Sequence, residues 1–214
     1  MTGINEEGKV GLANLALRKI GANRISSFND ETREGDLVRD VYQPVLEEVI
    51  TTFPWSFALT VVALTQKDIT PLSSIDGLTI AYAWPNDCLR PHRISQQAAF
   101  RVKMISGERV ILSDAANLQM EYVFRNDNPE TYFPIFKTAF ATRLAAEIGF
   151  NISHATKKAA LLREEYDKDL LPEAKSADSM QGSPDEVRQD EWEVSRISGA
   201  IIAIPGAATW HSVW

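Results

Sequence analysis

Cysteine is almost absent from this 214-residue sequence, because Cys88 is the sole example. An internal disulfide is therefore excluded, which is typical of proteins that fold in a reducing compartment such as a cytoplasm. Long apolar runs are also absent, and none approaches the roughly 18 residues of a membrane-spanning helix. The opening stretch MTGINEEGKV is polar and contains acids, unlike a secretory signal peptide. The sequence thus predicts neither a disulfide scaffold nor a membrane protein.

Positive charge is in the minority. Lys and Arg number 22 against 29 Asp and Glu, for a formal net charge of −7. A protein that binds nucleic acid by neutralising phosphates needs the opposite balance, and no basic recognition helix of a transcription regulator is evident. One region has a mild basic bias, which a wet sheet face would explain as well as a partner surface: Arg90, His92, Arg93, Arg101, Lys103 and Arg109.

Catalytic motifs are lacking too. The sequence contains no G-x-S-x-G nucleophile elbow and no phosphate-binding G-x-x-x-x-G-K loop. Cys88 and His92 have a C-x₃-H spacing, but no second pair of ligands accompanies them. The adjacent glutamates at 47–48 and 164–165 would point about 100° apart on a helix, so neither pair can flank one scissile bond. We expect no catalytic site, no cofactor and no metal, although acids brought together from distant parts of the chain stay open.

The strongest positive pattern is residues 34–57, EGDLVRDVYQPVLEEVITTFPWSF. Its apolar residues recur at steps of three and four, which predicts one face of a helix from about residue 31 to 53. Asn29 or Asp30 is the expected N-cap, and Pro44 should bend the helix without dividing it.

Large aromatic residues follow directly where this helix ends. Phe53, Pro54, Trp55 and Phe57 form the FPWSF stretch, after which the sequence acquires the texture of strands. We interpret these four residues as a structural junction that seals the helices against the strands.

Three further helices are predicted. The first covers about residues 5–20 and ends at Gly21, in the position of a left-handed cap. The second begins at Pro129 or Pro134 and ends at Gly149, with alanines that permit close packing. The third covers about residues 154–175 with Pro172 inside it, and its inward side is expected to consist of Leu161, Leu162, Tyr166, Leu170 and Leu171.

About five short strands are predicted between residues 58 and 125, consistent with a small antiparallel sheet. Ser106, Gly107 and Glu108 read as a hairpin loop, and Pro91 marks an edge or irregular strand. The expected fold class is α+β: a four-helix bundle-like α domain (residues 1–57 and 127–177), a small antiparallel β insertion (residues 58–126) and a long extended C-terminal tail (residues 178–214).

The tail combines acids with large apolar residues. Residues 178–214 hold six acids against two bases, yet they also contain three of the five tryptophans. Disordered solvating tails are depleted in such residues, so we expect a partner to cover them; a tail packed on its own domain is the alternative. The predicted interface residues are Trp192, Ile197, Ile201, Ile202, Ile204, Trp210 and Trp214.

Several segments together resemble a known family. They are residues 42–49 (YQPVLEEV), 53–58 (FPWSFA), 15–21 (LALRKIG), 82–90 (YAWPNDCLR) and 140–146 (FATRLAA). In this order and spacing they are similar to the tail tubular protein A family, the head-to-tail adaptors of short-tailed bacteriophages. The resemblance covers about residues 10–180, and the tail beyond about residue 184 has no counterpart in it.

This resemblance implies a structural, non-enzymatic virion protein, made in the host cytoplasm. Such adaptors form a homo-oligomeric ring of twelve subunits that joins the portal protein to the tail tube or nozzle. Genomic DNA passes through the lumen without sequence-specific binding, and an acidic lumen would let it slide. The small residues of 140–146 would then let neighbouring bundles approach closely. The alternatives are a neck or head-completion connector of a longer-tailed phage and, from another class, a tail-associated glycan hydrolase.

Overall fold

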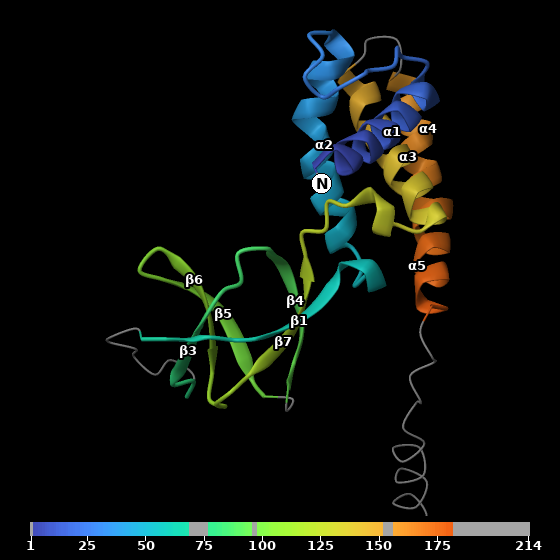
Figure 1. Cartoon of the computed structure of the whole chain (residues 1–214). Coiled ribbons are helices and arrows are strands. Elements are labelled where there is room, and N and C mark those ends of the chain that lie inside the picture. The colour runs from blue at the N-terminus through green and yellow to red at the C-terminus, as the bar shows by residue number, and fades with distance from the viewer. Residues whose placement is uncertain (1, 69–76, 96–97, 152–155, 182–214) are drawn as a thin grey trace, which may run out of the picture. The chain divides into compact units, whose positions relative to one another are not determined.

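The computed structural model describes residues 2–68, 77–95, 98–151 and 156–181 (Figure 1). By its internal contacts the chain falls into one compact unit, Met1–Asp178, and a second unit, Ser179–Trp214. The fold is α+β, as the sequence predicted. The division of the first 177 residues into a helical domain and a β insertion stays a prediction.

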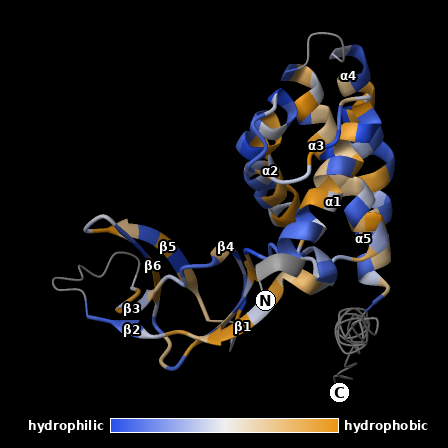
Figure 2. Cartoon of the chain, turned by 45° about the horizontal axis from the view of Figure 1, so that its top comes forward, coloured by the Kyte–Doolittle hydropathy of each residue, from blue (hydrophilic) through white to orange (hydrophobic). Residues whose placement is uncertain are grey.

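Five α-helices and one π-helical turn are described. Helix α3 is the central one, because it packs against α1, α2 and α4. Hydrophobic and hydrophilic residues alternate along these helices (Figure 2), as expected of amphipathic helices around a shared core. Their bounds are α1 Thr2–Ile20, α2 Arg33–Thr51, α3 Pro134–Asn151, α4 Thr156–Glu165, the π turn Tyr166–Leu170, and α5 Leu171–Ser179.

The end of α1 is as predicted. Gly21 has φ +77°, and the Ala22 N–H donates to the Leu17 carbonyl at 3.0 Å, as in a Schellman cap. The predicted start of α2 was wrong, because its N-cap is Thr32, whose hydroxyl accepts from the Gly35 N–H at 3.1 Å. Helix α2 nevertheless stays a single helix across Pro44.

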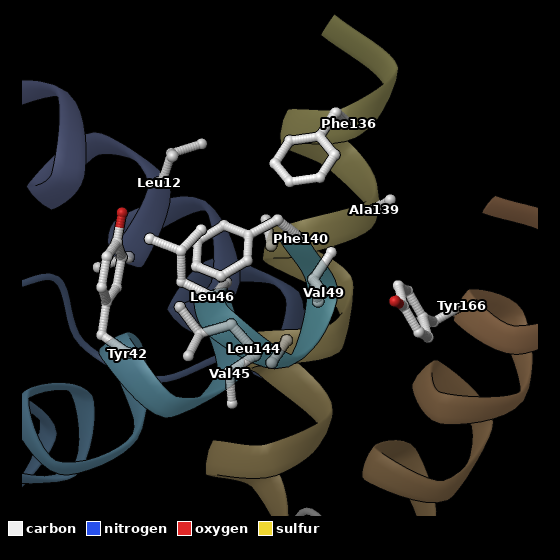
Figure 3. Close-up of a cluster of buried hydrophobic side chains, with 14 of the residues drawn as sticks. Leu12, Tyr42, Val45, Leu46, Val49, Phe136, Ala139, Phe140, Leu144 and Tyr166 are labelled. Atoms are coloured by element: carbon white, nitrogen blue, oxygen red, sulfur yellow. The ribbon is translucent and has the colours of Figure 1, made fainter. Parts of the chain in front are cut away.

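The core of the bundle is built on α2 and α3. Figure 3 shows Tyr42 and Leu46 of α2 among Phe140 and Leu144 of α3, and the rings of Tyr42 and Phe140 lie 5.2 Å apart, edge to face. The alanines of α3 are fully buried in this same bundle. Our expectation that the small residues of 140–146 meet a neighbouring copy was therefore wrong, because their own α1, α2 and α4 already cover them.

The helices after residue 133 differ from the prediction at Leu161, at the π turn and at Gly149. Leu161 is 66% exposed, since the inward stripe of α4 is Ala159 and Leu162 rather than Leu161. In the π turn the Leu171 N–H donates to the Tyr166 carbonyl. The turn ends two residues before Pro172, and it widens the helix close to the position where the proline lacks a backbone donor. Gly149 does not end α3, which continues to Asn151. A Cβ at Gly149 would lie 2.9 Å from the Cβ of Ala159, so the missing side chain brings α3 and α4 together.

The strands form two antiparallel sheets rather than the single small sheet we predicted. Their orders are β1-β7-β4 and β2-β3-β6-β5. The two-residue strand β2 carries no periodic signal, and it arises because the chain leaves β1 and enters the second sheet. The bounds are β1 Leu59–Ala63, β2 Gln66–Lys67, β3 Ile80–Ala83, β4 Cys88–Ile94, β5 Phe100–Ile105, β6 Glu108–Ser113 and β7 Gln119–Phe124.

One apolar cluster is shared by both sheets. Met120 of β7 and Cys88 of β4 lie in it together with Ile111 of β6 and Tyr82 of β3, all buried. The predicted hairpin between β5 and β6 is confirmed, since Ser106 and Gly107 both have positive φ, as a two-residue type I′ turn requires. Pro91 lies on the edge strand β4, and the register of β4 shifts on both sides of it. This confirms the irregular edge strand that we predicted from the missing N–H of proline.

Candidate functional site

An aromatic cluster forms around Trp55, at the end of α2. The side chain of Trp55 is completely buried. Its ring centroid lies 5.0 Å from that of Phe136, 5.1 Å from Phe53, 6.0 Å from Phe133 and 6.2 Å from Phe57. The structure thus brings the sequence-predicted junction residues Phe53, Trp55 and Phe57 together with two rings from the start of α3.

Hydrogen bonds fix the backbone around these rings. The indole Nε1 of Trp55 donates to the Val49 carbonyl at 3.0 Å. The amide of Asn126 donates to the Phe57 carbonyl at 2.7 Å, and the hydroxyl of Tyr132 donates to the Asn126 carbonyl at 2.6 Å. The chain leaving β7 is therefore tied to the end of α2 by polar groups as well as by ring contacts.

Asp178 adds a second anchor at the same place. Its carboxylate accepts from the Ser56 N–H at 3.1 Å and from the Ser56 hydroxyl at 2.7 Å. We expected Asp178 to begin an extended tail, but it lies in α5 with 6% of its surface exposed. The last helix therefore closes onto the 3₁₀ turn Ser56–Ala58, which precedes β1.

The junction also reaches the three-stranded sheet. Val123 of β7 is buried in the core that the helices form, and Leu59 of β1 packs against that core. Arg125, just after β7, forms an ion pair with Glu47 of α2 at 2.8 Å. Helices and strands thus share core residues, so a substitution at Trp55 should disturb the packing of both.

A charged pocket of about 170 Å³ lies between α2 and α3. Arg143 projects into it and is held by Glu48 at 2.7 Å and Glu147 at 2.8 Å. Burial lowers the pKa of the Arg143 guanidinium, but hydrogen bonds to Glu147 and Glu48 and their charges offset this and raise it overall. The guanidinium is therefore a fixed cation between two helices. The pocket walls are Asp40, Val41, Pro44, Val45, Glu48, Arg143 and Glu147.

Cys88 and His92, the residues of the C-x₃-H spacing, both have pKa values shifted by burial. Burial, followed by the charge of Asp87, raises the pKa of the Cys88 thiol from 9.0 to about 12, so the thiol stays protonated. Burial lowers the pKa of His92, against the opposing effect of Glu121. Within the described residues no three His, Cys, Asp or Glu side chains gather as metal ligands.

The basic residues of the strand region are divided between the two sheets. Arg90, His92 and Arg93 lie on β4, whereas Arg101 and Lys103 lie on β5. A third member of the second group, Arg109 of β6, stacks over the ring of Trp84 at 4.7 Å. What looked like one basic segment in the sequence is thus two separate groups.

The sequence alone did not identify every residue of the junction, and the structure does not describe every predicted interface residue. The ring partners Phe133 and Phe136, and the anchor Asp178, were missed because they come from distant segments. The alternation in β5 of Phe100, Val102 and Met104 with polar residues was a usable signal. The predicted tail residues lie outside the described residues: Trp192, Ile197, Ile201, Ile202, Ile204, Trp210 and Trp214.

Two comparisons complete the description of the chain. Among the helices that the structure describes, none combines the length and apolar character needed to cross a membrane. Neither a comparison with protein-family models nor a search of curated protein sequences finds a match for this chain.

Proposed function

We propose that this protein is a structural adaptor of a phage virion, which forms a ring between the portal and the tail tube or nozzle. The observation that carries the proposal is the junction around Trp55. Residues 53–58, one of the segments that together carry the resemblance, are also the residues through which α2, α3 and β1 share one core. An adaptor that holds two different partners needs such a fixed connection between its helices and its strands.

Two further features support a structural role. Two titratable groups with perturbed pKa values are partners in packing: the thiol of Cys88 lies in the two-sheet core, and the guanidinium of Arg143 is fixed between two glutamates. The net charge of −7 suits a ring through which DNA passes without adhering.

The test is assembly with the portal ring of the phage that encodes this chain. The purified protein is mixed with that portal and examined by size-exclusion chromatography with light scattering and by negative-stain microscopy. We expect a ring of twelve 23.9-kDa copies on one end of the portal. A portal from an unrelated phage is the control. The proposal is wrong if the protein stays monomeric and does not bind its own portal.

A further inference from the structure

Strand β5 presents an uncovered apolar row. It is the terminal strand of the sheet β2-β3-β6-β5, and its paired neighbour in the described chain is β6. Phe100, Val102 and Met104 point to one side of it, because alternate residues of a strand share a face. These three side chains are 36%, 40% and 65% exposed.

This row continues the interior of the two-sheet core. Val102 lies directly opposite Ile111 of β6, and Ile111 lies opposite Tyr82 of β3. Both of these neighbours are completely buried in the apolar cluster shared by the two sheets. At the level of Val102, within the described residues, this face is therefore covered at β3 and β6 and exposed at β5. An edge strand with exposed apolar side chains can pair with an added strand, whose own side chains then cover the apolar row.

Charge disfavours a second β5, paired about Val102, as that strand. Antiparallel pairing of two β5 strands about Val102 would place Arg101 of each copy opposite Lys103 of the other. Like charges directly opposite one another destabilise a strand pair, whereas opposite charges stabilise it. The fitting strand has acids alternating with apolar residues.

The chain itself contains such a segment. Residues 191–194 read EWEV, with Trp192 and Val194 alternating with two glutamates. In antiparallel register, Trp192 opposite Val102 places Val194 opposite Phe100. The same register places Glu193 opposite Arg101 and Glu191 opposite Lys103.

We propose that residues 191–194 of a neighbouring copy add to β5 as a fifth strand of its sheet. The inference rests on the proposed ring, since a head-to-tail contact repeated from copy to copy gives a ring when its rotation closes and an open filament when it does not. The nine residues that follow Gln181 span about 30 Å when extended, so residues 191–194 can lie well away from the end of α5. The backbone of β5 gives the affinity, and the alternating side chains give the register.

A charge exchange tests the register. Arg101→Glu faces Glu193 with a like charge and should reduce the yield of rings about tenfold. Glu193→Arg should do the same, and the double variant R101E/E193R should restore assembly. Because damage to β5 alone would not be repaired by a change in the distant segment, rescue separates pairing from folding. Lys157→Glu, an exposed reversal on α4, is the matched control and should leave assembly unchanged.

A cross-link tests which copy supplies the strand. In a Cys88→Ser background, copies with Val102→Cys are mixed with copies with Trp192→Cys and oxidised gently. We expect a disulfide between the two kinds of copy. Val61→Cys, on β1 and 60% exposed, is the control and should give none. A second variant carries both Val102→Cys and Trp192→Cys in one chain. If a disulfide forms within that chain and none forms between the two single-cysteine copies, the proposal is wrong.

The two proposals can fail separately. If the unaltered protein forms no ring with its portal, the adaptor function is wrong, whatever the cross-link shows. If rings form normally with R101E and with E193R, and no cross-link appears between copies, the strand pairing alone is wrong.

Discussion

Replacing Trp55 by alanine empties the centre of the junction. The indole is completely buried and touches rings from α3 and from both sides of its own segment. Deletion of a buried aromatic side chain costs about 3–5 kcal/mol, through lost transfer energy and the cavity that remains. The upper part of that range applies where the surroundings cannot collapse, and four neighbouring rings with fixed backbones collapse poorly.

The hydrogen bond of the indole adds little to this magnitude. The Val49 carbonyl, which accepts it, also accepts from the Thr52 N–H at 3.3 Å and from the Thr52 hydroxyl at 2.7 Å. Removing the indole therefore leaves no buried acceptor without a donor, and the large penalty for such a group does not arise. Trp55→Phe loses the bond and part of the volume, and should cost about 1–2 kcal/mol.

The assay is urea unfolding followed by circular dichroism at 222 nm. For a chain of this size each kcal/mol also lowers Tm by about 2–4 °C. Leu161→Ala, at a two-thirds exposed position of α4, is the matched control and should change stability by less than about 0.5 kcal/mol. A loss below about 1 kcal/mol for Trp55→Ala, with an unchanged dependence on urea, would refute the reasoning.

Asp178→Ala should cost about 1–3 kcal/mol in urea unfolding, because the N–H and hydroxyl of Ser56 lose hydrogen bonds to a charged acceptor, and Asp178→Asn should cost less; equal losses would contradict this. Arg143→Met should cost about 1–3 kcal/mol at pH 7, since Glu48 and Glu147 lose their shared cation but are exposed enough to regain water; an unchanged urea midpoint would show that the ion pairs are dispensable. Iodoacetamide should alkylate Cys88 much more slowly in the native protein than in urea at pH 8, because burial shields the thiol and its raised pKa leaves little thiolate, and the native rate should rise with pH while the fold persists. Mass spectrometry measures both rates, and similar rates in the two states would show that the thiol is not shielded.

Local patterns predicted those features of the fold that depend on neighbours in sequence. The left-handed residue at Gly21 follows from the end of an apolar periodicity, and the turn at Ser106 and Gly107 follows from two short alternating runs. The irregularity of β4 follows from the chemistry of Pro91. In each case a few adjacent residues contain the whole physical cause.

Predictions of which helix residues pack against other helices were less accurate. Leu161 and Leu162 are chemically equivalent, and the position of α3 decides that Leu162 is the buried one. The alanines of α3 could have faced another copy, but three helices of the same chain enclose them. Gly149 was predicted to end its helix, but its missing side chain instead allows Ala159 of α4 to approach α3 closely.

The sequence by itself determined the α+β composition, the amphipathic face of α2 and the presence of an aromatic plug after it, because these depend on periodicity and on residue type. Tertiary structure alone decided the partners of that plug. Phe133 and Phe136 surround Trp55, and Asp178 holds the turn beside it, although they lie about 80 to 120 residues away in the sequence. It also divided the strands into two sheets and left the apolar row of β5 uncovered. Long-range packing and pairing select these arrangements, since burial depends on what lies opposite in space and not on what comes next in the chain.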